Sequence, residues 1–178
     1  MEHSRLILAQ NQLENLLDWF EQRCVLAPAS LHGRITAAFR IAARIYLYGL
    51  ASGHDRFSKT QELSEELTGV LRSINTDPKA YDHNLVWVYL VGGANCTRTS
   101  SFRKYFDSRL DRYRRARGQS TYQSMKRIAT ILEEVWQQKD NAQDLSVKDS
   151  EDWRDVMSRN GWVFLTHLVA VEPLQVKI

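Results

Sequence analysis

The sequence LVWVYLVGGA, residues 85–94, decides the fold of this chain. Its first seven residues are leucine, β-branched or aromatic, a composition that taken alone is typical of a buried strand. The apolar run is, however, the end of a longer span that opens with Asp77-Pro78, a capping residue followed by a proline at the first helical position. From Pro78 onward this span has 14 residues before the pair Gly92-Gly93. Length and punctuation therefore favour a central buried helix that stops at the glycines.

The rest of the chain shows helical spacing, and no other segment alternates with the period of two that would make a partner strand. Apolar residues recur every three or four positions in six further segments: residues 6–20, 31–49, 58–74, 102–113, 120–136 and 153–157. Ser30 is a predicted N-cap, and Ser58 with Gln61 and Ser120 with Gln123 are predicted capping boxes. The pattern predicts one all-α domain over residues 1–178, a bundle of about seven helices that is complete or part of a larger helical domain.

Length and composition limit the class of protein. The chain has 178 residues, 43% of them hydrophobic, with only 8 Gly and 3 Pro, which fits one domain with a sizeable core and excludes a collagenous or disordered chain. Cys24 and Cys96 are too few for a disulfide framework or a thiolate metal cage, so we expect a reducing compartment. The opening MEHSRLILAQ is unlike a secretory leader, and residues 85–94 are too few to span a bilayer. We expect a soluble intracellular chain with no membrane partner.

The net charge of +3 is a cancellation between two neighbouring segments. Residues 98–117 carry eight basic and two acidic side chains, a net charge of +6, whereas residues 128–161 carry four basic and eight acidic ones, a net charge of −4. The candidate basic contact patch consists of Arg103, Lys104, Arg109, Arg112, Arg114, Arg115 and Arg117. Three interpretations stay open: a solvated helix face with its arginines pointing outward, a surface that contacts phosphate or an import receptor, and internal neutralisation by the acidic segment.

A search for catalytic or metal-binding residues is negative. None of the five histidines lies three or four residues from another histidine or from a cysteine, so the spacing of zinc ligands is lacking. Cys96 with His83 is a conceivable nucleophile and base, but Cys96 follows an apolar stretch, which favours a structural role. Gly92-Gly93 lacks the pattern of a phosphate-binding loop, and the adjacent Glu133 and Glu134 diverge on a helix. We therefore predict that the chain is not an enzyme and holds no cofactor.

Four blocks of sequence, in the same order, resemble one protein family. Residues 43–50, ARIYLYGL, are similar to a helix with an Ala-Arg-Ile-Tyr-Leu core in the fungal-specific transcription factor regulatory domain. Residues 85–94 are similar to that family's Trp-centred apolar helix, with Val88 where the family usually has Pro, and residues 102–110 match the helix that follows. Residues 152–157, DWRDVM, with Gly161-Trp162 resemble its C-terminal signature. The shared order of the blocks makes the resemblance specific.

The resemblance implies a function as well as a fold. It implies an all-α module, similar to the C-terminal half of the family's regulatory domain, that controls transcription without catalytic residues. Protein partners, self-association or a small effector would then be its contacts, in the nucleus or shuttling between nucleus and cytoplasm. The family binds DNA through a six-cysteine zinc cluster, which two cysteines cannot form. Zinc and DNA contact are therefore expected only in a separate DNA-binding domain.

A second hypothesis is a helical sensor that binds a small molecule. The candidate residues, which either line an apolar pocket or belong to the core, are Tyr46, Trp87, Tyr89 and Trp162. A chain that resembles part of a larger domain should also expose apolar surface for the missing half or for a partner. We expect that surface on residues 6–20 or 162–171.

Overall fold

The computed structural model describes residues 2–23, 30–50, 56–74, 84–115, 119–142 and 153–161, and within these ranges it has seven helices and no strand. The helices are α1 (Glu2–Arg23), α2 (Leu31–Leu50), α3 (Arg56–Ser73), α4 (Val86–Ala94), α5 (Ser101–Arg115), α6 (Gln119–Ala142) and α7 (Trp153–Arg159). The predicted all-α fold is confirmed. None of the helices in these ranges combines the length and the apolar character needed to cross a membrane.

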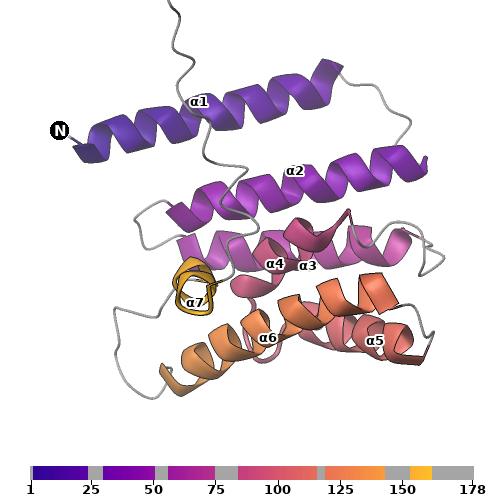
Figure 1. Cartoon of the computed structure of the whole chain (residues 1–178). Coiled ribbons are helices and arrows are strands. Elements are labelled where there is room, and N and C mark those ends of the chain that lie inside the picture. Colours follow the sequence, from indigo (N-terminus) through magenta and orange to yellow (C-terminus); the bar gives the residue numbers. More distant parts are fainter. Residues whose placement is uncertain are drawn as a thin grey trace, which may run out of the picture.

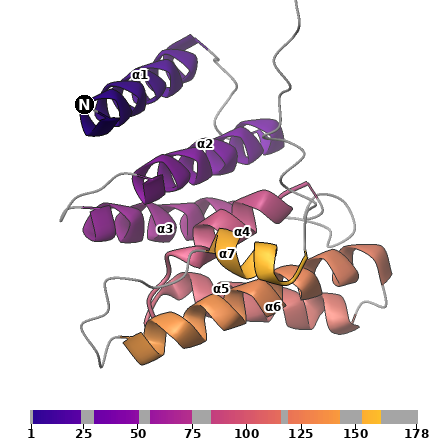
Figure 2. The ribbon, with the colours of Figure 1, turned by 60° about the vertical axis from the view of Figure 1, so that its left-hand side comes forward.

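Helix α4 lies at the centre of the bundle and contacts α2, α3, α5 and α6 (Figure 1). Helices α2 and α3 lie along one side of it, and α5 and α6 form a helical hairpin on the other side. The short α7 packs against α6, and α1 lies outside α2 as the outermost helix in both views (Figures 1 and 2). The segment with the most strand-like composition is therefore the buried centre of a helical fold.

The helical prediction for the central apolar run is confirmed, because eight of the nine residues of α4 are buried and only Trp87 is partly exposed. A segment surrounded by other helices needs apolar residues on all its faces, which gives a continuous run rather than a stripe. The expected start of this helix at Asp77-Pro78 lies outside the described residues.

The two glycines of α4 do not end the helix as predicted, because α4 continues through them to Ala94. A Cβ atom added to Gly93 would lie 2.7 Å from Cδ1 of Leu132 and 2.9 Å from Cε1 of Phe102. One added to Gly92 would overlap the side chain of Leu67. The glycines are therefore explained by the close approach of α3, α5 and α6 to the α4 backbone rather than by a helix stop.

The predicted N-cap is correct at Ser30 and wrong at Ser58. Ser30 is the N-cap of α2, because its Oγ accepts a hydrogen bond of 3.0 Å from the amide of Gly33. Ser58 is not a cap, since α3 already begins at Arg56, and the side chain of Ser120, the second residue of α6, lies outside the described part of the chain. A serine is tolerated within the first turn, where the backbone amides have no intrahelical acceptor, so the sequence pattern of a capping box does not locate the cap uniquely.

Candidate functional site

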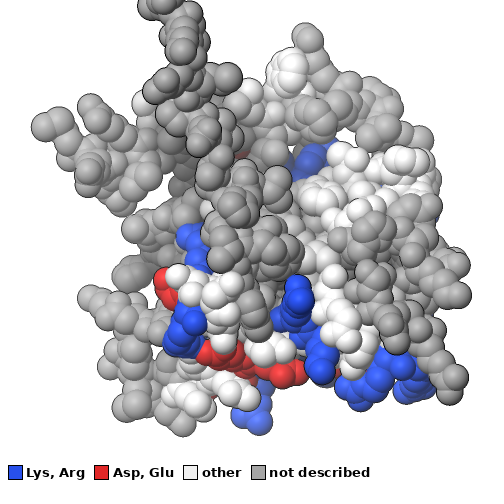
Figure 3. Space-filling model, viewed as in Figure 1, with Lys and Arg blue, Asp and Glu red and all other residues white. Residues whose placement is uncertain are grey.

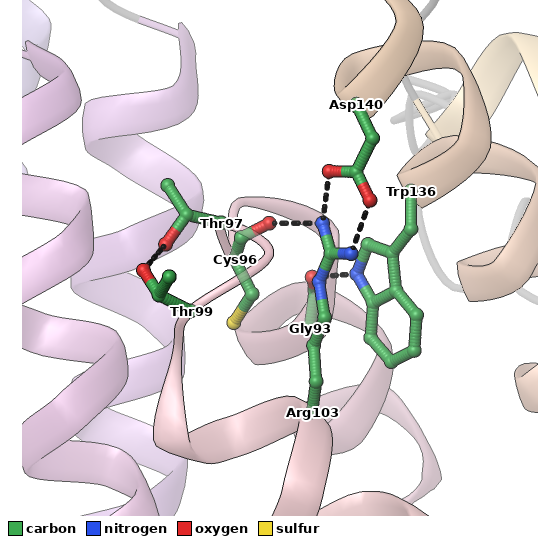
Figure 4. A network of polar contacts seen from close by, with 7 residues as sticks. All are labelled: Gly93, Cys96, Thr97, Thr99, Arg103, Trp136 and Asp140. Carbon is green, nitrogen blue, oxygen red and sulfur yellow. Dashed lines mark hydrogen bonds and ion pairs between the residues drawn. The ribbon is translucent and has the colours of Figure 1, made fainter.

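The structure divides the predicted basic patch into internal and external arginines, and Arg103 is internal. Its guanidinium makes two hydrogen bonds to the Asp140 carboxylate, Nη1–Oδ2 of 2.7 Å and Nη2–Oδ1 of 2.9 Å (Figure 4). The same guanidinium lies 4.7 Å from the centre of the Trp136 ring, a cation–π contact. Asp140 belongs to the acidic segment of the sequence, so Arg103 follows the interpretation of internal neutralisation.

Arg103 also takes part in a set of donors that satisfy the carbonyl groups at the end of α4. Its Nη2 donates to the carbonyl of Cys96 at 3.0 Å, and the Trp136 indole donates to the carbonyl of Gly93 at 2.8 Å (Figure 4). The Lys139 ammonium donates to the carbonyl of Ala94 at 2.6 Å. Cations at a helix C-terminus are favoured by the helix dipole, and the last carbonyls of a helix lack an N–H partner from a following helical turn. Arg103, Lys139 and Asp140 therefore stabilise the fold and are not available as a contact surface.

Arg109 is also internal, so the interpretation of a solvated helix face with outward-pointing arginines does not hold for it. It is 6% exposed, and its guanidinium carbon lies 5.6 Å from the centre of the Tyr113 ring. Phe106 and Tyr113 are buried, so Arg109 shares the inner side of α5 with them. An arginine stem can cover apolar surface while its charged end stacks on an aromatic ring, an arrangement that a count of charges does not detect.

The remaining described members of the patch, Lys104, Arg112, Arg114 and Arg115, are exposed. Lys104, Arg112 and Arg115 follow one another at steps of eight and three residues, which places them on one face of α5, and we call them the basic stripe. Arg114 lies beside them in a solvent-exposed ion pair of 3.3 Å with Asp111. Arg117 lies outside the described residues.

Helix α6 adds two exposed cations, Lys126 and Arg127, that lie outside the predicted patch. In the sequence, both residues follow the dense run of arginines. They come near the cations of α5 because α5 and α6 pack against each other as a hairpin. Figure 3 shows lysine and arginine side chains gathered over the end of the molecule where α5 leads into α6. Several exposed cations close together suit phosphate or carboxylate groups without selecting a sequence.

The predicted pocket residues fall into two groups instead of one. Tyr46 and Trp87 have ring centroids 6.2 Å apart, and Trp153 lies 6.5 Å from Tyr46. The Arg154 guanidinium lies 4.8 Å from the centre of the Tyr46 ring, so an aromatic contact and a cation–π contact join α7 to α2. Trp162, the fourth candidate, lies outside the described residues.

Tyr89 belongs to the other group. It is fully buried, and its ring centroid lies 5.8 Å from that of Phe106 and 6.4 Å from that of Tyr105. Tyr89 follows Trp87 by two residues, so the two rings leave α4 in nearly opposite directions. The described candidates therefore do not line one common pocket.

Cys96 has the properties of a structural cysteine. Its thiol is buried and donates to the carbonyl of Gly92 at 3.0 Å, and burial raises the pKa of the thiol to about 11. A group with this pKa is almost entirely protonated at neutral pH and is a poor nucleophile. His83, its conceivable base, lies outside the described residues. Among the residues that the structure describes, no group of three or more His, Cys, Asp and Glu side chains is arranged to hold a metal ion.

Helix α1 exposes several large apolar side chains. The expectation of apolar surface on residues 6–20 is met by large side chains of α1, whereas residues 162–171 lie outside the described part of the chain. Among the α1 side chains that the structure describes, the large exposed apolar ones are Leu8, Leu13, Leu16 and Trp19. Together, the fold and its faces define an all-helical domain whose exposed cations and apolar side chains are suited to contacts with other macromolecules.

Comparison with known proteins identifies the class of this domain. The family model for the fungal specific transcription factor domain, which describes the sequences of that family, matches residues 3–166 of this chain. The chain therefore belongs to the family of fungal specific transcription factor domains, as the four blocks of its sequence predicted.

A curated relative agrees with this assignment. The chain is similar to the transcriptional regulatory protein pro1 of Neurospora crassa, with 33% identity over 171 residues. The aligned region covers 84% of this chain and 24% of the relative, so the chain spans about a quarter of the relative's length. No solved structure matches the chain.

Proposed function

We propose that this chain is a regulatory module of a fungal transcription factor and that it acts through contacts with proteins. The observation that carries the proposal is the family match over residues 3–166, on a helical fold with exposed cationic and apolar faces. The described arginines nearest the acidic segment stabilise the fold, and the basic stripe and the outer face of α1 remain for contacts. A module of this kind needs no catalytic residues, and DNA would be bound by a separate domain.

The test is a reporter assay with a tethered chain. The whole chain is fused to a neutral DNA-binding domain and expressed in a fungal cell with a reporter gene under the matching site. The proposal expects reporter output to rise or fall relative to the DNA-binding domain alone, with equal amounts of both proteins. Output equal to that of the DNA-binding domain alone, from a folded fusion protein, would contradict a regulatory role.

The basic stripe supports a second part of the proposal, which is the location of the chain in the nucleus. Clusters of exposed lysine and arginine are the feature that import receptors bind, and such a cluster ends α5. We expect the double substitution Arg112→Glu with Arg115→Glu to lower the nuclear fraction of a fluorescent fusion. The control, Arg72→Glu with Arg98→Glu, changes the charge equally at exposed residues elsewhere. Equal nuclear fractions of the two variants would contradict an import role for the stripe.

A small effector is compatible with this proposal but does not carry it. The structure places Tyr46 with Trp87, and Tyr89 in a separate buried group, so an aromatic pocket built from all of them is not supported. A thermal-shift screen of the purified chain against lipids and metabolites measures whether any effector binds.

A further inference from the structure

The cations of the basic stripe are not used by the fold. Lys104, Arg112 and Arg115 are exposed, and their side chains form no ion pair or hydrogen bond with any residue that the structure describes. Arg103 and Arg109 of the same helix differ from them, because both are held by neighbouring side chains inside the bundle. The charges of the stripe are therefore available to an anionic partner.

The stripe lies along one side of α5. At 3.6 residues per turn, Lys104 and Arg115 point about 20° apart around the helix axis, and Arg112 about 80° from Lys104. The three positions span about 17 Å along the helix, and the exposed Ser108 lies between them. Each strand of duplex DNA carries one phosphate for about every 3.4 Å of its axis, so a stripe of this length faces several phosphates.

Helix α6 extends the positive surface through Lys126 and Arg127 (Figure 3). Neither side chain has a printed or charged partner within the described ranges of the chain. Two carboxylates of α5, Asp107 and Asp111, oppose these cations, and Asp111 already forms an ion pair of 3.3 Å with Arg114. Positive charge therefore remains in excess on this surface.

The composition of the surface favours phosphate over an acidic protein. Among the described residues, the large exposed apolar side chains lie on α1 and α2, and none lies on α5 or α6. Protein–protein interfaces have an apolar, often aromatic centre from which charged residues are depleted. Protein–DNA interfaces are more polar and much more positively charged. The exposed residues beside the cations are polar as well, among them Ser108, Gln123 and Thr130.

We infer that the basic stripe, together with Lys126 and Arg127, binds the phosphate backbone of duplex DNA without reading its sequence. Contacts to phosphates add affinity and fix orientation but carry no sequence information. The contact goes beyond the proposed function, which leaves sequence recognition to a separate domain. The choice of DNA among polyphosphates rests on that function, because a module of a DNA-bound regulator meets the duplex at a high effective concentration. Binding of an import receptor to the same stripe does not compete with this contact, since the two occur in different compartments.

The first test is fluorescence anisotropy of the whole chain with two labelled duplexes of about 24 base pairs and unrelated sequence. Both should bind with the same affinity, with a Kd of about 1–100 µM at physiological salt. The logarithm of the binding constant should fall linearly with the logarithm of the salt concentration, with a slope of about −3 to −4.5 for three to five phosphate contacts. Absence of binding at about 50 mM salt overturns the inference, as does a difference of more than about tenfold between the duplexes.

A neutral double substitution locates the contact. Arg112→Gln with Arg115→Gln should weaken binding at least about tenfold at about 100 mM salt and reduce the slope by about two. The control, Gln22→Glu with Gln137→Glu, lowers the net charge by the same amount at exposed positions of α1 and α6 and should keep the binding. All four residues are exposed, so the circular dichroism of both variants should match that of the wild type. Equal losses in the two variants would assign the binding to net charge and overturn the inference.

A variant that gains binding excludes misfolding as an explanation. Asp107 lies one turn from Lys104, so Asp107→Asn removes a negative charge beside the stripe and should strengthen binding about two- to fivefold. The control is Glu66→Gln, which makes the same change of charge at an exposed position of α3 and should have a smaller effect. Binding by Asp107→Asn that is no tighter than binding by Glu66→Gln would contradict the position of the contact.

A poly-glutamate peptide with the same number of negative charges as the duplex tests the other class of partner. If the chain binds this peptide more tightly than the duplex at equal salt, the stripe is a site for acidic proteins and the inference is wrong. Weaker binding of the peptide supports the phosphate backbone. Failure here is distinguishable from failure of the proposed function, because the reporter fusion receives its attachment to DNA from another domain. A chain that changes reporter output without binding the duplexes overturns the DNA contact alone.

Discussion

The Trp136 indole of α6 donates a hydrogen bond of 2.8 Å to the carbonyl oxygen of Gly93 in the last turn of α4. The two residues are 43 positions apart in the sequence, and their contact joins the central helix to the longest helix of the bundle. The bond is possible because the glycine has no side chain, so α6 and α5 approach the backbone of α4 closely.

We predict that Gly93→Ala lowers the free energy of unfolding by about 1–3 kcal/mol, because the new methyl group overlaps the buried side chains of Leu132 and Phe102. Urea titration followed by circular dichroism measures this change. The matched control is Gly69→Ala, at a helical glycine with nothing within 4 Å of the new Cβ atom. The control should raise the free energy by about 0.5–1 kcal/mol, the helix preference of alanine over glycine. Equal effects of the two substitutions would contradict the close approach at Gly93.

The ion pair between Arg103 and Asp140 should stabilise the fold, in contrast to the exposed pairs. Its two side chains are 11% and 24% exposed and share two hydrogen bonds. We expect Asp140→Asn to cost about 1.5–3 kcal/mol in the free energy of unfolding, as for a hydrogen bond to a charged group. Lys59→Ala, which removes an exposed pair with Glu62, should cost at most about 0.5 kcal/mol. If Asp140→Asn costs no more than Lys59→Ala, the structural role of the pair is wrong.

The pH dependence of stability should reveal Glu65, which bonds to the start of α5. Burial alone would raise the pKa of Glu65, but hydrogen bonds from the Ser101 and Ser100 side chains and the Ser101 amide outweigh it and hold the pKa below its ordinary value of 4.5. A lowered pKa in the folded state stabilises the protein above the ordinary pKa, and this stability is lost as the pH falls through the folded pKa. Glu65→Gln should therefore unfold more easily than the wild type at pH 7, and the difference should shrink below about pH 4.5. A difference that does not depend on pH would rule out the carboxylate as its source.

Asp107, on α5, should behave in the opposite way to Glu65 of α3. Burial and the charge of Asp111 raise the pKa of Asp107 above its ordinary value of 3.8, against the opposing effect of Arg103. A raised pKa in the folded state means that the ionised group destabilises the fold at neutral pH, and that protonation relieves this cost as the pH falls. Asp107→Asn should therefore be more stable than the wild type at pH 7 and similar to it in acid. Thermal unfolding across this pH range measures both differences, and destabilisation at pH 7 would contradict the raised pKa.

The sequence predicted the elements of this fold better than their contacts. The apolar spacing of α2, α3, α5 and α6 is periodic, and the central run at residues 85–94 had both the length and the flanking residues of a helix. The need for glycine at position 93 could not be inferred from the neighbouring sequence. It depends on Leu132 and Phe102, which contact α4 only in the folded chain.

The candidate site shows the same limit. A count of charges found the arginines of α5, but their roles differ because Asp140 and Trp136 of α6 hold Arg103, and Tyr113 accompanies Arg109 into the core. Exposed apolar surface on α1 was predictable from the resemblance to part of a larger domain. The polar attachment of that helix to Arg44 and Tyr48 was not, since it depends on which side of α1 meets α2.

The most direct test of the central claim asks whether the folded module, rather than a short stretch of its sequence, controls transcription. The measurement is reporter output from the DNA-binding-domain fusion carrying Gly93→Leu, which should disrupt the core around α4, beside the fusion carrying Gly69→Ala, which should not. The account predicts that the Gly69→Ala fusion keeps the output of the wild-type fusion and that the Gly93→Leu fusion falls to the level of the DNA-binding domain alone. Full output from a Gly93→Leu fusion whose module is shown to be unfolded would contradict it.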